Sequence, residues 1–117
     1  MAFLKGNKGE IEVRTEVKVN GDLGKIIPVS FITRWRTFSV SDTRKLRDEA
    51  QLPGFDEDAI IRDRLAGWRD LKGEDGSDVP FGEDVVTEML ERHEYRKALV
   101  DALLGVAFGI QSVQEKN

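Results

Sequence analysis

The sequence has 117 residues, which fits one domain of ordinary size and leaves too little chain for a second hydrophobic core. Charged residues make up 34% of it, above the roughly 25% of an average protein, and 18 basic and 22 acidic side chains give a net charge of -4. This balance argues against a dedicated nucleic-acid binder, whose surface is strongly basic. Because the sequence contains no cysteine, disulfides and thiolate chemistry are excluded.

The ends of the chain carry no targeting pattern. Residues 1–9 have no apolar stretch of the length that a secretory signal requires, and we expect them to be flexible. The longest strongly apolar segment covers residues 102–110, about half of what a helix needs to cross a bilayer. We therefore expect no membrane association.

Residues 10–38 have the pattern of a β-hairpin. In residues 10–19 charged side chains alternate with apolar residues and one threonine. This alternation indicates a strand with one half-buried face, formed by Ile11, Val13, Thr15, Val17 and Val19. Asparagine and glycine in residues 20–24 suit a reversal of the chain. The returning segment places its apolar residues two or four apart, at Ile27, Val29, Phe31 and Trp35. Pro28 within it lacks a backbone donor and belongs near a strand start or on an edge.

Residues 39–117 are predicted to be mainly helical. A first helix should begin near Ser41 and end before residues 52–54, and a second should run to about Leu65. Residues 67–72 read as an extended piece, residues 73–78 as a polar turn, and two further helices should follow from about Glu83 and Tyr95. We predict a single α+β domain over residues 1–117, with an N-terminal β-hairpin packed against three to four helices and residues 68–72 as a candidate third strand.

The sequence offers little catalytic chemistry. His93 is the only histidine, so one chain cannot assemble a paired-histidine metal site or an imidazole relay. Carboxylates cluster at residues 56–58 and 74–78, but helix starts and turns explain them better than a metal does. No P-loop and no serine in a nucleophile elbow is present. We expect a protein that is not an enzyme, has no cofactor or metal and has no catalytic residue. A small metal-dependent nuclease or hydrolase using the carboxylates near Asp56 and Asp75 is a weaker alternative.

The last predicted helix has a wide apolar arc. Its main stripe consists of Leu99, Leu103, Val106 and Ile110. These residues could form the core, an interface in a homo-oligomer, or the lining of a groove that holds a helix of a partner, and they are the candidate partner-binding residues. Gly105 and Gly109 are spaced as in helix pairs that approach closely.

The segment from Leu65 to Phe108 resembles the tail assembly chaperone family of long-tailed bacteriophages and prophages. The resemblance consists of an ordered set of short motifs. These are Gly67-Trp68-Arg69-Asp70-Leu71, the acidic turn Glu74-Asp75-Gly76, Val79-Pro80-Phe81 before an acidic helix start, and an aliphatic and alanine-rich final helix. Together they cover somewhat more than a third of the chain. The motif residues are expected to be structural, with Trp68 and Phe81 as apolar anchors and Pro80 directing the chain into the helix.

The resemblance implies a function in viral morphogenesis. Members of the family are non-catalytic helpers in the cytoplasm of the bacterial host, where they bind the tape measure protein and help to recruit tail tube subunits around it. The family often also makes a longer product by ribosomal frameshifting, and this chain would be the short form. A structural tail-completion or connector protein that stays in the virion is the main alternative.

Overall fold

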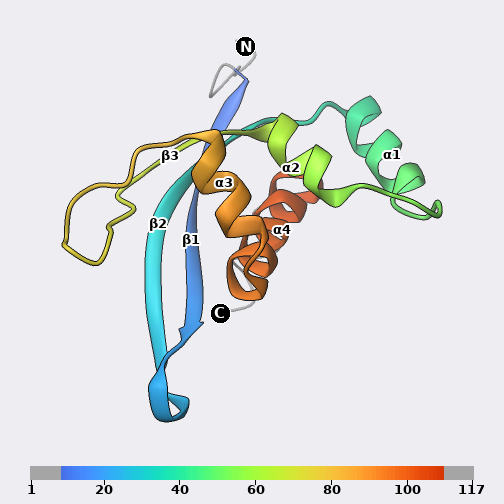
Figure 1. Cartoon of the computed structure of the whole chain (residues 1–117). Helices are drawn as coiled ribbons and strands as arrows, with labels where there is room; N and C mark the ends of the chain where they lie inside the picture. Colours follow the sequence, from blue (N-terminus) through green and yellow to red (C-terminus); the bar gives the residue numbers. More distant parts are fainter. Residues whose placement is uncertain (1–8, 110–117) are drawn as a thin grey trace.

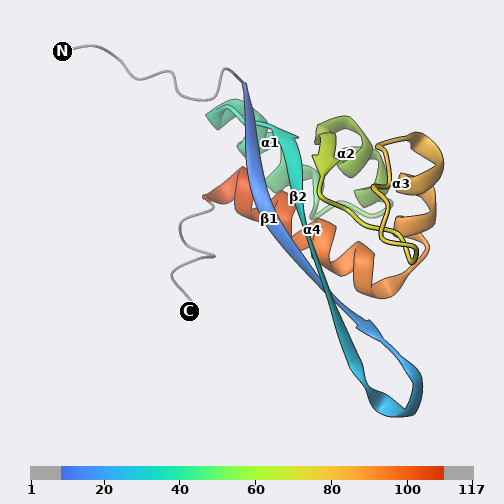
Figure 2. The same ribbon diagram turned by 90° about the vertical axis from the view of Figure 1, so that its left-hand side faces the viewer.

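Two long antiparallel strands form the spine of the fold. β1 (Glu10–Asn20) and β2 (Ile26–Arg36) are joined through the 3-10 turn η1 (Asp22–Gly24) and pair along their whole length. The structure is a computed structural model that describes residues 9–109. In it β3 (Leu65–Arg69) pairs antiparallel with the other side of β2, which gives the strand order β1-β2-β3. The far end of the hairpin projects well beyond the rest of the molecule (Figures 1 and 2).

Four helices complete the architecture. They are α1 (Val40–Glu49), α2 (Glu57–Arg64), α3 (Glu83–Leu90) and α4 (His93–Phe108). They gather on one side of the sheet, and α4 packs along β1 (Figure 1). The predicted α+β fold, with an N-terminal hairpin, a third strand and four helices against the sheet, is confirmed.

The alternation predicted for the first strand is observed, and its inner face joins the core. Thr15 and Val17 are buried on β1, opposite Phe31 and Val29 of β2. A small polar network lies among these side chains, because the Thr15 and Thr33 hydroxyls are 2.9 Å apart and the Trp35 indole N–H donates to the Thr33 hydroxyl at 2.7 Å. Each buried polar atom in this network therefore has a hydrogen-bond partner, so burying the two threonine hydroxyls costs little free energy.

Side-chain capping sets the starts of α1 and α2. Ser39 and Asp42 form a capping box, since each side chain accepts a hydrogen bond from the backbone N–H of the other. α1 therefore begins at Val40, one residue before the predicted start. The Asp56 carboxylate caps α2 by accepting from the N–H of Ala59 at 3.2 Å. The acidic run at residues 56–58 begins a helix, as the sequence indicated.

The third strand lies earlier in the chain than predicted. It begins at Leu65, directly after α2, and ends at Arg69, whereas the sequence suggested residues 68–72. Asp70 explains the early end, because its φ of 63° lies in the left-handed region, which is incompatible with a continuing strand. The polar turn of residues 73–78 is confirmed: the Asp75 carboxylate accepts from Ser77, and Gly76 has a φ of 83°.

Two expectations fall partly or wholly outside the described residues. They concern the flexibility of residues 1–9, of which the structure describes only Gly9, and the contacts of Ile110. Among residues 9–109, no helix is both long enough and apolar enough to cross a bilayer.

Candidate functional site

The predicted partner-binding stripe of α4 lies mostly inside the molecule. Leu99 is 0% exposed and Leu103 is 3% exposed, and both belong to the cluster that packs against the sheet. Of the roles considered for the stripe, burial places both residues in the core, and Leu103 also lines part of the groove described below. Their contact with a partner stays a prediction. Val106 is half-buried against the same core. Its contact with a partner stays a prediction.

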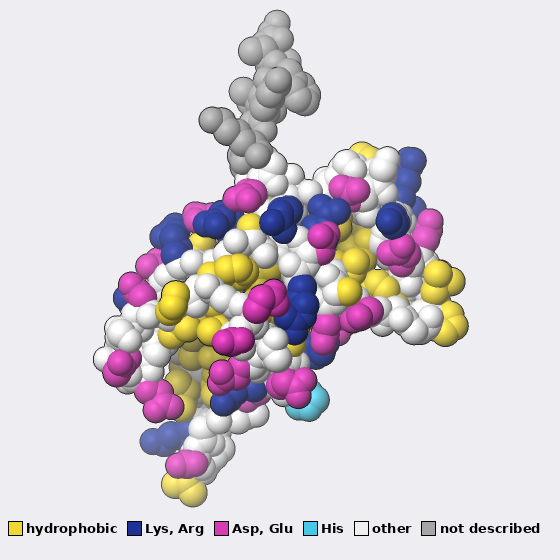
Figure 3. Space-filling model, turned by 45° about the horizontal axis from the view of Figure 1, so that its top comes forward, with side chains coloured by type: hydrophobic (Ala, Val, Ile, Leu, Met, Phe, Trp, Pro, Cys, Tyr) yellow, Lys and Arg dark blue, Asp and Glu magenta, His cyan; other side chains and the backbone are white. Residues whose placement is uncertain are grey.

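The neighbouring flank of the same helix is accessible instead. Leu104 is 44% exposed and Phe108 is 49% exposed, and Val100 lies one turn before Leu104. These side chains form one wall of a groove of about 240 Å³ between α4, α1 and the loop that joins α1 to α2. We call it the α1–α4 groove, and it is lined by Leu46, Arg47, Ala50, Phe55, Glu57, Val100, Leu103, Leu104 and Phe108. Figure 3 shows apolar side chains at the surface in the region of α1 and α2.

The opposite wall of the groove is held by few contacts. α1 buries only one side chain, Leu46. The Thr43 hydroxyl donates to the backbone carbonyl of Ala107 at 3.0 Å, which joins the start of α1 to the end of α4. Arg64 pairs with Asp42 at 3.3 Å and its guanidinium lies 4.0 Å from the ring centroid of Phe38. These contacts fix one end of α1, and the end that lines the groove depends on Leu46.

The paired-glycine motif in α4 has a different role from the one the spacing suggested. Gly105 is buried in the helix, but Gly109 follows the helix end and has a φ of 116°. That conformation is accessible to glycine and rarely to other residues, so Gly109 ends the helix. It does not offer a second packing surface on the helix.

The motif segment of residues 67–81 is tied to the core through Trp68 and Leu71. The Trp68 indole is buried, donates to the carbonyl of Val79 at 2.9 Å, and meets the rings of Phe31 and Phe81 edge to face with centroids 6.3 Å and 4.7 Å away. Phe81 covers Trp68 while remaining 43% exposed. Trp68 is thus part of the core, in agreement with the expected anchor role, whereas Phe81 packs on it from the surface.

The remaining motif positions shape the loop. A β-carbon at Gly67 would lie 2.7 Å from the Arg34 guanidinium, so the glycine leaves room for that side chain. Gly76 supplies the positive φ of the turn, and Asp75 holds the turn through Ser77. Hydrogen bonding to the Ser77 hydroxyl and then to its backbone N–H lowers the pKa of Asp75. Pro80 is exposed two residues before Gly82, which precedes α3.

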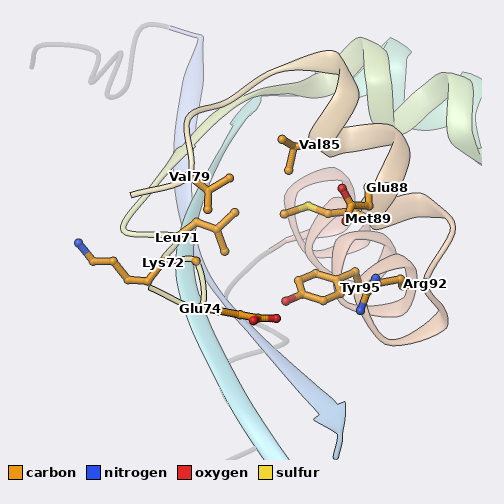
Figure 4. Close-up of a pocket in the computed structure, with 10 residues that line it drawn as sticks. Leu71, Lys72, Glu74, Val79, Val85, Glu88, Met89, Arg92 and Tyr95 are labelled. Carbon is orange, nitrogen blue, oxygen red and sulfur yellow. The ribbon is translucent and has the colours of Figure 1, made fainter. Parts of the chain in front are cut away.

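A second hollow lies between this loop and the helices. It has a volume of about 340 Å³, and Leu71, Val79, Val85 and Met89 point into it from opposite sides (Figure 4). Glu74, Glu88, Arg92 and Tyr95 surround it, and burial raises the pKa of Tyr95. An apolar floor with a charged rim suits an apolar side chain of a partner protein. It does not supply a nucleophile paired with a base.

The carboxylates considered for metal binding are used in structural contacts. Arg96 pairs with Glu57 at 2.8 Å and with Asp58 at 2.5 Å, and Lys72 pairs with Asp78 at 2.5 Å. Among the residues the structure describes, no three acidic or histidine side chains are grouped so that they could hold a metal ion. His93 is the first residue of α4 and is exposed, with its ring visible at the surface in Figure 3.

Sequence reasoning identified the right helix but missed the groove. Leu104 is next to the predicted stripe in the sequence of the helix. Leu46 and Phe55, which line the groove with it, come from segments about 50 residues away and could not be linked to it from the sequence. Comparison with known proteins gives no match to a family model, to a curated protein or to a solved structure.

Proposed function

We propose that this chain is a non-catalytic tail assembly chaperone of a bacteriophage or prophage, which binds the tape measure protein in the cytoplasm of the bacterial host and assists assembly of the tail tube. The ordered motif set between Leu65 and Phe108 suggests the family. The observation that carries a chaperone role is the α1–α4 groove, since a protein that holds a helical client must keep apolar surface accessible.

The groove suits one face of an amphipathic helix. Val100, Leu104 and Phe108 are four residues apart, so they project from one side of α4 in successive turns. Leu46 and Phe55 face them from the other side of the groove. A client helix with apolar residues at i, i+4 and i+7 would bury these side chains, with Arg47 and Glu57 at the margin for charged groups of the client.

Co-expression with the large helical tail protein tests this proposal. The wild-type chain should co-purify with it, and Leu104→Glu should abolish capture while leaving the melting temperature close to that of the wild type, because Leu104 is exposed and glutamate favours helices. Val40→Glu is the matched control, since Val40 is 68% exposed at the start of α1 and does not line the groove. Failure of the wild type to bind the tail protein would contradict the proposal.

The alternative function predicts a different location in the mature particle. A chaperone should be found in infected cells and be missing from purified virions. A structural tail-completion or connector protein should be present in purified virions at a fixed number of copies. Quantitative mass spectrometry of both samples separates the two functions, and recovery from virions would favour the alternative.

A further inference from the structure

The far end of the β-hairpin exposes a group of apolar side chains. Leu23 is 99% exposed, Ile26 is 55% exposed and Ile27 is 50% exposed. We call these three residues the apolar tip. It lies at the end of the projecting hairpin, beyond the start of α4 (Figures 1 and 2). Nothing within the described residues buries it.

Leu23 occupies this position at a conformational cost. Its φ of 58° and ψ of 33° lie in the left-handed region, which a leucine adopts with a penalty of about 1–2 kcal/mol. Asparagine, aspartate or glycine would adopt the same conformation more readily and would not expose a large apolar side chain to water. The fold gains no contact in return. Strained residues of this kind concentrate at positions where another molecule binds.

The α1–α4 groove has the complementary properties. Its volume of about 240 Å³ exceeds the roughly 150 Å³ of an apolar cavity that accepts a benzene ring, so it has space for a leucine side chain. Charges also match. Asp22 and Lys25 flank Leu23, and their side chains make no ion pair within the described residues. Arg47 lies on the rim of the groove and likewise has no ion pair within the described residues, whereas Glu57 on the same rim already pairs with Arg96 at 2.8 Å.

The tip and the groove lie far apart on one molecule, so a chain cannot fill its own groove. The hairpin end is at the bottom of Figure 1, whereas α1 lies at the upper right. We propose that the apolar tip of one copy docks in the α1–α4 groove of a second copy, with Leu23 seated between α1 and α4. In this arrangement Asp22 lies beside Arg47 of the second copy, whose guanidinium has no other ion pair within the described residues.

This contact joins two different surfaces of the chain. When two copies have joined, one still has a free groove and the other a free tip, so further copies can bind. Such heterologous contacts form a ring where the rotation closes and an open chain where it does not. The role of the contact rests on the proposed function of the groove: the tip covers an apolar surface that would otherwise promote aggregation, and a client helix displaces it. Self-association and client capture therefore compete.

Two variants and their mixture test the docking directly. Leu23→Asp removes the tip and leaves the groove, and Leu104→Glu closes the groove and leaves the tip. Analytical ultracentrifugation should show concentration-dependent association of the wild type and weakening by about tenfold or more in each variant. An equimolar mixture of the variants should form a heterodimer that cannot extend, because only one intact tip and one intact groove remain. Val40→Glu should associate like the wild type.

A charge exchange tests the orientation. Asp22→Arg should weaken association, and combining it with Arg47→Asp in the same chain should restore it, since each contact regains opposite charges. A wild type that stays monomeric at all concentrations would overturn the proposal, and so would a mixture of the two variants that forms no heterodimer.

The same variants separate this inference from the proposed function. Leu23→Asp should still capture the client, and should do so at lower concentration because no tip competes. If no variant and no wild-type chain binds the tail protein while the mixing experiment succeeds, docking stands and the chaperone function fails. If the tail protein is captured while every variant associates like the wild type, the chaperone function stands and the docking of the tip fails.

Discussion

Replacing Trp68 by alanine should remove a large part of the stability of the fold. The indole is 8% exposed, donates one hydrogen bond to the carbonyl of Val79, and contacts the rings of Phe31 and Phe81. Truncating a buried tryptophan costs about 3–5 kcal/mol, and the hydrogen bond adds about 1 kcal/mol within that range. A domain of this size is stable by about 5–15 kcal/mol, so Trp68→Ala should remove from about a fifth of that stability to nearly all of it.

Urea unfolding followed by circular dichroism measures this loss. The midpoint should fall strongly for Trp68→Ala, and Trp68→Phe should recover much of the difference because it keeps an aromatic ring and loses only the N–H donor. In a thermal scan the alanine variant should melt more than about 10 °C below the wild type. Capture of the client by molecules that remain folded should change little, because Trp68 does not line the α1–α4 groove. A melting temperature within error of the wild type would refute the reasoning.

Three further predictions concern capping, pH and the C-terminal helix. Ser39→Ala should lower the free energy of unfolding by about 1 kcal/mol in urea titrations, because it removes the acceptor for the N–H of Asp42 in the capping box. The hydrogen bond from the backbone N–H of Ser39, more than any other contact, holds the pKa of Asp42 below its ordinary value. The unfolded chain therefore binds this proton at higher pH than the folded chain, and stability present above about pH 4 should fall as the pH drops through the lowered pKa. Asp42→Asn should flatten that acid limb in melting curves recorded against pH. Val106→Asp should unfold the chain, since Val106 packs against the core, and a folded variant with normal assembly and normal client binding would exclude any role for this residue.

The hairpin could be predicted from the sequence because one face of it is buried. A period of two residues places Thr15 and Val17 on the same face, and the burial of that face fixes the register. The acidic start of α2 at Asp56 could also be predicted, and the predicted start of the first helix was within one residue of the observed one, since capping depends on neighbouring residues alone.

The third strand was harder to place because its limits depend on distant contacts. Leu65 looked like the end of a helix, and pairing with Trp35 of β2 turns it into the start of a strand. The strand stops at Asp70, whose left-handed backbone is not visible in the sequence. Local patterns therefore indicated an extended segment in this region but misplaced it by about three residues.

The site was only partly predictable for a related reason. In α4 the apolar residues cover a wide arc, and periodicity cannot say which part of that arc meets the sheet. Packing on β1 selects Leu99 and Leu103 for the core and leaves Leu104 and Phe108 on the flank. The other wall of the groove comes from α1, which buries a single side chain and has only Val40 and Leu46 as apolar residues. Because the groove is formed by two helices that are distant in the sequence, it can be located only once the fold is known.

The unequal attachment of the two groove walls suits the binding of a client. α4 is anchored in the core through Leu99 and Leu103, so one wall is rigid. The capping box of Ser39 and Asp42 stabilises the start of α1, but an isolated helix of 10 residues is marginal in water, so α1 also depends on its few tertiary contacts. Its tertiary attachment consists chiefly of Leu46 and the Thr43 hydrogen bond to Ala107. Because α1 is held by fewer contacts than α4, we expect it to be displaced more easily, so that the groove can widen for the hairpin tip of a second copy or for the broader face of a client helix without loss of the core.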